Sequence, residues 1–157
     1  MMDFQHNEQE NDLFEAPGPV LVPANLAKRL VNYVTDIILG AILLNFILVL
    51  VAQRYPAYVQ ALLTPPYDMV KTLTISLFLA IYLGLQEALL GGKTIGKYLT
   101  RTRAVRLDGS PISAETAFSR SIIRVVPFEQ FSILIMGRPW HDSWSKTIVI
   151  DEMASTL

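Results

Sequence analysis

Residues 30–52 read LVNYVTDIILGAILLNFILVLVA and carry one charge, Asp36. At about 1.5 Å per residue, a helix of this length crosses the roughly 30 Å hydrocarbon layer of a bilayer. Residues 72–90, TLTISLFLAIYLGLQEALL, form a second such run and also carry one charge, Glu87. Soluble cores rarely need two uncharged runs of this length. The sequence therefore predicts two transmembrane helices.

A third apolar stretch is shorter and interrupted. Residues 122–136, IIRVVPFEQFSILIM, include Arg124, Pro127 and Glu129. Fifteen interrupted residues are too few for a routine span. We expect an interfacial helix, or a broken segment buried against the two spans.

The composition excludes several classes of protein. Of the 157 residues, 52% are hydrophobic and 17% are charged, against roughly 25% charged in an ordinary soluble domain. The net charge of −1 gives no reason to expect nucleic acid or another polyanion as a partner. Without cysteine, thiol catalysis and zinc–thiolate sites are excluded. We expect no metal site and no cofactor. No nucleophile–base set is grouped in the sequence, so we do not expect an enzyme.

Basic residues predict the orientation. Cytoplasmic flanks of membrane spans are enriched in Lys and Arg. The connection 53–71 contains two basic residues, Arg54 and Lys71. Pro56, Pro65 and Pro66 predict that this connection is bent and lies on the outer side. The segment before the first span and the segment after the second span together hold seven basic residues: Lys28, Arg29, Lys93, Lys97, Arg101, Arg103 and Arg106. We expect a multi-pass protein of the plasma (inner) membrane with both termini in the cytoplasm.

The chain divides into a membrane domain between two tails. Residues 1–24 are acidic, include three prolines and read as a mobile, disordered tail. Residues 25–151 form the membrane domain, and residues 152–157 are a C-terminal tail. The fold class expected is an all-α membrane protein with two transmembrane helices, the partial third helix and a small cytoplasmic two-stranded β-ribbon.

Local signals place the smaller elements. The pair Gly91-Gly92 ends the second span as a C-terminal cap, and residues 93–100 can form a short surface helix. Residues 101–107 and 146–151 favour strands. Ser113 caps a further helix, which lies flat on the inner surface or docks against the spans.

The most informative pattern is a polar stripe on the first span. Asn25, Arg29, Asn32 and Asp36 are separated by four, three and four residues, which places them on one helical face. An ionised carboxylate in the hydrocarbon costs about 2.5–3.5 kcal/mol unless it is paired or protonated. Asp36 should therefore face protein or a water-filled cavity.

A charge cluster is expected around this stripe. Glu87 belongs to the same inner half of the bilayer, and Arg29, Arg120 and Arg124 are the cations on that side. We expect Asp36 and Glu87 to meet one or more of these arginines. In the alternative interpretation, Arg29 snorkels to the interface, Glu87 reaches water, and Asp36 is a packing or assembly device.

Four blocks in order carry a family resemblance. They are RLVNYVTD at 29–36, GGKTIGKYLTRTRAVRLDGSPIS at 91–113, RSIIRVVPFE at 120–129 and WHDSWSKTIVI at 140–150. From about Asn25 to Ile150 the chain resembles the RDD family of small bacterial membrane proteins.

The resemblance implies roles for individual residues. The Arg and two Asp that name the family map onto Arg29, Asp36 and Asp142. The family usually has Arg directly after the second Asp, where this chain has Ser143. If that Arg partners Asp142, another residue such as Arg138 or Arg120 must replace it. The resemblance further implies a plasma-membrane protein with a proposed transport role, for which ion–proton exchange has been suggested.

The functional expectation is transport of a small ion, with cation/proton exchange as the candidate mechanism. Asp36 would bind the ion or titrate, and Arg29 would set its pKa. Asp142, with Arg120 or Arg124, would close the inner mouth. Two spans cannot enclose a path, so transport requires a homo-oligomer in the lipid bilayer. The alternative is a non-transporting assembly or regulatory protein in which the Arg/Asp cluster is structural.

Three other features have ordinary explanations. The GGKT at 91–94 has Glu87 where a phosphate loop needs glycine. Lys93 and Lys97 are expected to anchor the chain to anionic lipid. His141 is expected to be a polar loop residue, and Glu129 to pair with Arg124 or cap a turn.

Overall fold

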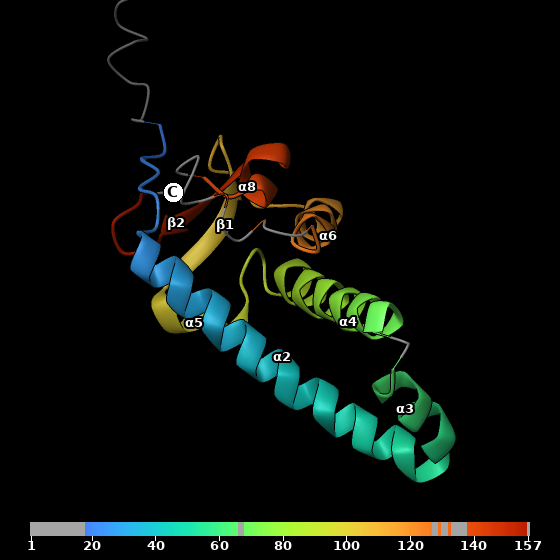
Figure 1. Cartoon of the computed structure of the whole chain (residues 1–157). Coiled ribbons are helices and arrows are strands. Elements are labelled where there is room, and N and C mark those ends of the chain that lie inside the picture. Colours follow the sequence, from blue (N-terminus) through green and yellow to red (C-terminus); the bar gives the residue numbers. More distant parts are fainter. Residues whose placement is uncertain (1–17, 66–67, 127–128, 130–131, 133–137, 157) are drawn as a thin grey trace, which may run out of the picture.

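Two long helices, joined at one end, carry a small lobe at the other end (Figure 1). The structure is a computed structural model of the chain and describes residues 18–65, 68–126, 129, 132 and 138–156. The long helices are α2 (Leu26–Arg54) and α4 (Asp68–Leu89), and the short helix α3 (Pro56–Leu63) lies between them in the chain.

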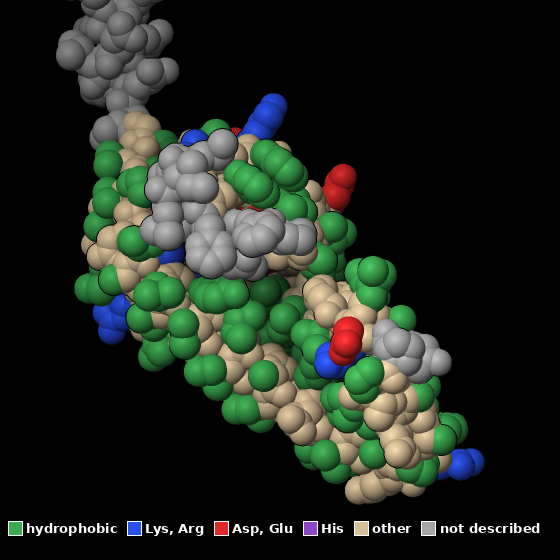
Figure 2. Space-filling view, viewed as in Figure 1, with side chains coloured by type: hydrophobic (Ala, Val, Ile, Leu, Met, Phe, Trp, Pro, Cys, Tyr) green, Lys and Arg blue, Asp and Glu red, His purple; other side chains and the backbone are tan. Residues whose placement is uncertain are grey.

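Both long helices are apolar enough to cross a membrane. In the most apolar 18-residue window of each, only 11% of α2 and 17% of α4 is buried within the protein. A core helix of a soluble domain is mostly buried, so these helices expose apolar side chains as transmembrane helices do. Figure 2 shows such side chains along both helices on the face in view.

Local chemistry fixes the ends of α2 and α3. The side chain of Asn25 caps α2 by accepting a hydrogen bond from the Lys28 N–H at 2.9 Å. After Arg54, Tyr55 leaves the helical conformation, and Pro56 begins α3 at a position where its missing N–H is not needed. The predicted bent connector therefore contains a helix.

The small lobe consists of α5 (Ile95–Thr100), β1 (Thr102–Arg106), α6 (Ala114–Ile123), α8 (Trp140–Trp144) and β2 (Thr147–Asp151). The two strands pair antiparallel, with Ala104 opposite Val149, as the sequence predicted. The buried apolar core of the lobe is Ala24, Ala104, Ile112, Ala117 and Val149. The main features of the predicted fold, a helical protein with two candidate spans and a small ribbon, are confirmed.

The lobe is attached to both long helices. Helix α5 packs on α2, and α6 packs on α4. A Cβ at Gly84 would lie 2.7 Å from the Phe118 ring, so the glycine allows α6 to approach α4 closely. Ser113 caps α6 as predicted. Of the two predicted placements of this helix, the structure has the docked one.

The glycine pair after α4 reverses the chain. Gly91 and Gly92 have φ of 59° and 88°, which L side chains rarely adopt. A Cβ at Gly92 would also lie 2.3 Å from the carbonyl oxygen of Ala104. The cap predicted at this pair is therefore present, and it returns α5 toward the end of α4.

Both predicted tails make contacts in the described part of the chain. The Ala24 N–H donates to the Val149 carbonyl, and the Asp151 N–H donates to the Val22 carbonyl, each at 2.9 Å. Val20 also pairs with Thr156. Residues 22–24 thus lie along the free edge of β2, and Val20 lies beside Thr156 beyond the end of the strand, because an unpaired strand edge offers backbone donors and acceptors. Residues 1–17 of the predicted N-terminal tail lie outside the described residues.

The predicted third segment, 122–136, is described only in part. Helix α6 ends at Ile123, and the structure describes 124–126, Glu129 and Ser132 beyond it. The interfacial or broken character predicted for residues 127–128, 130–131 and 133–136 lies outside the described residues.

Candidate functional site

Glu87 is the centre of a buried ion-pair network. It lies in the last turn of α4, and its Oε1 accepts hydrogen bonds from Lys97 Nζ at 2.5 Å and Arg124 Nη2 at 2.8 Å. Its Oε2 accepts one from Arg120 Nε at 2.9 Å. The carboxylate is fully buried, so three cations replace the water that it would have at the surface.

Arg120 extends this network to a second carboxylate. Its Nη1 donates to Asp142 Oδ1 at 2.8 Å, and Arg29 Nη1 donates to Asp142 Oδ2 at 2.7 Å. Burial favours the neutral acid, but the charges of Arg120 and Arg29 hold the pKa of Asp142 well below its usual range. Arg120 therefore takes the partner role left open by Ser143. Arg138 instead donates to the Thr147 carbonyl.

Five of the six predicted cluster residues are thus brought together. The ion-pair network contains Arg29, Glu87, Lys97, Arg120, Arg124 and Asp142. It ties the start of α2 and the end of α4 to three elements of the small lobe. Because every member is held by an opposite charge, the network is suited to fixing the lobe on the two helices.

Asp36 lies outside this network. Its Oδ2 accepts a hydrogen bond from the Thr94 hydroxyl at 2.5 Å, and its Oδ1 accepts one from the Gly96 N–H at 2.8 Å. These partners are neutral groups at the start of α5. Arg29 was expected to set the pKa of Asp36, but its ion-pair partner is Asp142. Arg29 lies two helical turns away, where it also donates to the carbonyls of Ala24 and Val149.

Sequence reasoning missed Lys97 and Thr94. Lys97 was expected at the lipid surface, yet its side chain is 4% exposed and paired with Glu87. Burial lowers the pKa of Lys97 to about 8, although the charge of Glu87 opposes this shift. The sequence does contain a pattern that predicts this pair. Two glycines lie between Glu87 and Lys97, and they can reverse the chain and bring the two charges together.

A third polar contact completes the seam between α2 and the lobe. The Asn32 side-chain amide lies 2.5 Å from the Thr100 hydroxyl and 2.9 Å from the Thr102 hydroxyl. The predicted polar stripe therefore shares one face of α2. Arg29, Asn32 and Asp36 all direct their side chains to groups of the small lobe.

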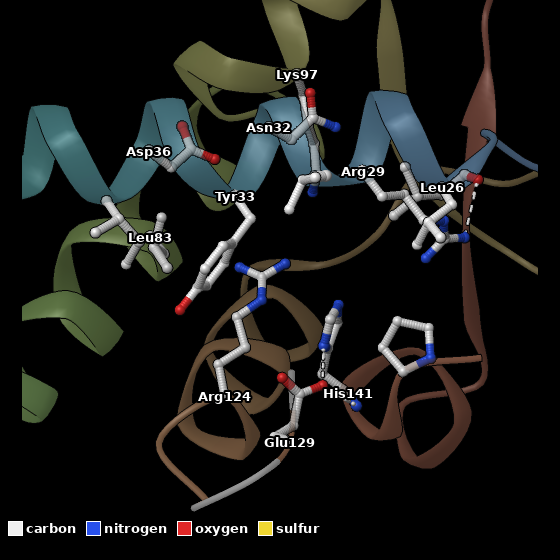
Figure 3. Close-up of a pocket in the computed structure, with 14 residues that line it drawn as sticks. Leu26, Arg29, Asn32, Tyr33, Asp36, Leu83, Lys97, Arg124, Glu129 and His141 are labelled. Carbon is white, nitrogen blue, oxygen red and sulfur yellow. Dashed lines mark hydrogen bonds and ion pairs between the residues drawn. The ribbon is translucent and has the colours of Figure 1, made fainter. Parts of the chain in front are cut away.

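A cavity of about 510 Å³ separates this face of α2 from α6 and α8 (Figure 3). Tyr33, Asp36 and Leu83 lie at one side of it, and Arg124 projects between the helices. Glu129 and His141 form a pair on the opposite wall, with Glu129 Oε1 2.5 Å from His141 Nδ1. Glu129 was expected to pair with Arg124 or to cap a turn, and its Oε1 also accepts a hydrogen bond from the His141 backbone N–H in the first turn of α8. The cavity lining includes Arg29, Asn32, Asp36, Lys97, Arg124, Glu129 and His141.

A comparison with models of protein families shows the family to which the chain belongs. The RDD family model matches residues 23–146, which is most of the chain. The chain belongs to the RDD family. No curated protein and no solved structure matches it. Family membership and the two apolar helices together make this RDD protein a membrane-associated protein.

The resemblance maps the Arg and the two Asp of the family name onto Arg29, Asp36 and Asp142, and these three residues have different environments in the structure. Arg29 pairs with Asp142, the second Asp of the family pattern. Asp36, the first Asp, is held by Thr94 and Gly96. Arg29 therefore forms its ion pair with the small lobe, and the hydrogen bonds to Asp36 come from neutral donors.

The Glu129–His141 pair of this RDD protein predicts a pH dependence. Burial, together with the charge of Arg124, lowers the pKa of His141 from 6.5 to about 4. Between these values the unfolded chain binds a proton on His141 that the folded protein does not, so acidification through this window destabilises the fold. Thermal unfolding in detergent should show a midpoint that falls as the pH drops from about 6.5 to about 4. In His141→Gln the midpoint should fall less steeply over the same window. Equal pH slopes for His141→Gln and wild type would contradict this assignment.

Proposed function

We propose that this RDD protein binds a small ion at Asp36 and carries it across the membrane in exchange for a proton. The observation that carries the proposal is the contrast between the two carboxylates of the long helices. Glu87 accepts from three cations, whereas Asp36 accepts from a hydroxyl and a backbone N–H. Glu87, which is held by three cations, is not expected to release them for a proton or another ion. A carboxylate with neutral donors can exchange a proton for a cation.

The surroundings of Asp36 support a small cation. Its carboxylate lines the 510 Å³ cavity, and the Thr94 hydroxyl, which now donates to it, also has lone pairs. Carboxylate and hydroxyl oxygens are ligands that small hard cations favour. In this proposal the ion displaces the proton that Asp36 would otherwise bind.

The proposed setting is the plasma (inner) membrane, with the small lobe and both termini in the cytoplasm. Basic residues near the lobe, including Arg101 and Arg106, favour this orientation. Two spans cannot enclose a path, so we propose a homo-oligomer. Apolar side chains such as Ile42 and Phe46, which are 62% and 60% exposed, can contact lipid or a second copy.

The test is ion flux by the purified protein in liposomes. Internal pH is followed with a trapped dye after pulses of different salts. We expect wild type to move protons in response to a cation gradient, and Asp36→Asn to fall to the level of empty liposomes. The matched control is Asp68→Asn, which removes an exposed carboxylate at the far end of α4. Flux that persists unchanged in Asp36→Asn would remove Asp36 from the proposal.

A second candidate function is a non-transporting assembly or regulatory protein. The saturation of Glu87 and Asp142 by cations favours it, because such a network holds a cytoplasmic lobe in place for a partner. This candidate predicts that the wild-type protein shows no flux above empty liposomes with any salt. The liposome measurement therefore separates the two candidates.

A further inference from the structure

The cavity beside α2 is amphipathic and continues into a second hollow. Its wall on α2 runs from Leu26 to Ile37, which is roughly 16 Å along the helix axis. The second hollow, of about 180 Å³, shares Tyr33, Ile37, Leu83 and Arg124 with the first. The pair of hollows therefore extends from the beginning of α2 into the depth of the two apolar helices.

The end of the cavity near the lobe carries charges of both signs. The Arg124 guanidinium and the Glu129 carboxylate project into the space between α2 and the lobe (Figure 3). Arg29 lines the same end. Arginine recognises phosphate through several N–H donors, and a carboxylate accepts from an ammonium group. A lining with both signs is complementary to a zwitterion.

The walls on α2 and α4 also carry apolar side chains, some of which are exposed on the surface of the helices. Tyr33 and Leu30 of α2 line the first hollow and are 45% and 58% exposed. Leu79 and Ala80 of α4 line the second hollow, together with the polar residues Ser76, Ser121 and Arg124. An apolar passage that continues from a charged end matches a chain attached to a polar headgroup. A free ion or an isolated phosphate would leave the passage unused.

We propose that these hollows bind one zwitterionic aminophospholipid from the surrounding membrane. The phosphate lies against Arg124, and the amine lies against Glu129. One acyl chain follows Tyr33, Ile37 and Leu83 to Leu79 and Ala80. Basic pockets between membrane helices bind phospholipid headgroups by the same chemistry. The lipid would occupy the cavity that Asp36 also lines, but its binding does not require ion transport.

The test is native mass spectrometry of the full-length protein, delipidated and then given defined lipids. The probes are phosphatidylethanolamine, the anionic phosphatidylglycerol, chainless glycerophosphoethanolamine and inorganic phosphate. We expect one bound phosphatidylethanolamine per chain, with an affinity about tenfold above that for phosphatidylglycerol. Equal binding of either chainless probe would overturn the proposal, because the apolar passage would then contribute nothing. Preference for phosphatidylglycerol would overturn the headgroup assignment.

Two variants with a matched control locate the lipid. Ile37→Trp fills the passage and should weaken phosphatidylethanolamine binding about tenfold. Ile38→Trp places the same ring at the next position, which lines neither hollow, and should bind as wild type does. Glu129→Gln should remove the preference for phosphatidylethanolamine while phosphatidylglycerol still binds, a result that a misfolded protein would not give. Equal binding by Ile37→Trp and Ile38→Trp, or an unchanged preference in Glu129→Gln, would overturn the proposal.

Discussion

Glu87→Gln is expected to lower the free energy of unfolding by about 3–5 kcal/mol, the cost of removing one partner from a buried ion pair. The glutamine keeps the shape of the side chain but removes the carboxylate that forms ion pairs with Lys97, Arg120 and Arg124. Arg120 retains Asp142. The buried Lys97 loses its ion-pair partner, and the lobe loses these ion pairs with α4.

Denaturant unfolding in detergent, followed by circular dichroism, measures this change. Glu115→Gln is the matched control, because Glu115 is exposed in the first turn of α6 and its loss should cost about 1 kcal/mol at most. Adding Lys97→Met to Glu87→Gln should recover part of the loss, since one uncompensated cation is then removed as well. Unfolding of Glu87→Gln at the wild-type denaturant concentration would show that the network does not stabilise the fold.

Gly96→Ala is expected to destabilise the protein by about 1–3 kcal/mol, as overpacking of a close contact does. A Cβ at this position would lie 2.6 Å from the Asn32 carbonyl oxygen and 2.9 Å from the Asn32 Cα. Backbone atoms cannot rotate away, so α5 must move off α2. That movement lengthens the hydrogen bond from the Gly96 N–H to Asp36.

The sign of this effect distinguishes packing from helix propensity. Alanine is favoured over glycine within a helix by about 1 kcal/mol, so propensity alone predicts stabilisation. The measurements are the thermal midpoint in detergent and flux in liposomes, both of which should fall. Gly18→Ala is the control, because nothing lies within 4 Å of its added Cβ. A Gly96→Ala protein as stable as wild type would mean that α5 does not pack so closely on α2.

Much of the fold could be predicted because its signals are local. The two apolar runs, the glycine pair, the Ser113 cap and the two strand segments all depend on neighbouring residues. The pairing of residues 22–24 with β2 could not be predicted in the same way. It depends on which edge of the ribbon remains free once the lobe has docked.

The site shows the same division between what is local and what is not. The helical spacing of the polar stripe correctly put Arg29, Asn32 and Asp36 on the face of α2 that meets the lobe. The partners of these residues depend on the chain reversal after Glu87 and on the position of α8. For that reason Lys97 was missed, and Asp142 was not predicted as the ion-pair partner of Arg29.

The proposal that Asp36 binds the ion is tested most directly by the infrared carboxyl band of the reconstituted protein, recorded as salt is added at constant pH. If Asp36 exchanges a proton for the ion, a carboxylic-acid stretch should weaken as the cation binds. The change should be present in Asp68→Asn and absent in Asp36→Asn. A salt-dependent band that survives in Asp36→Asn, or a wild-type spectrum that salt leaves unchanged, would contradict the assignment of ion binding to Asp36.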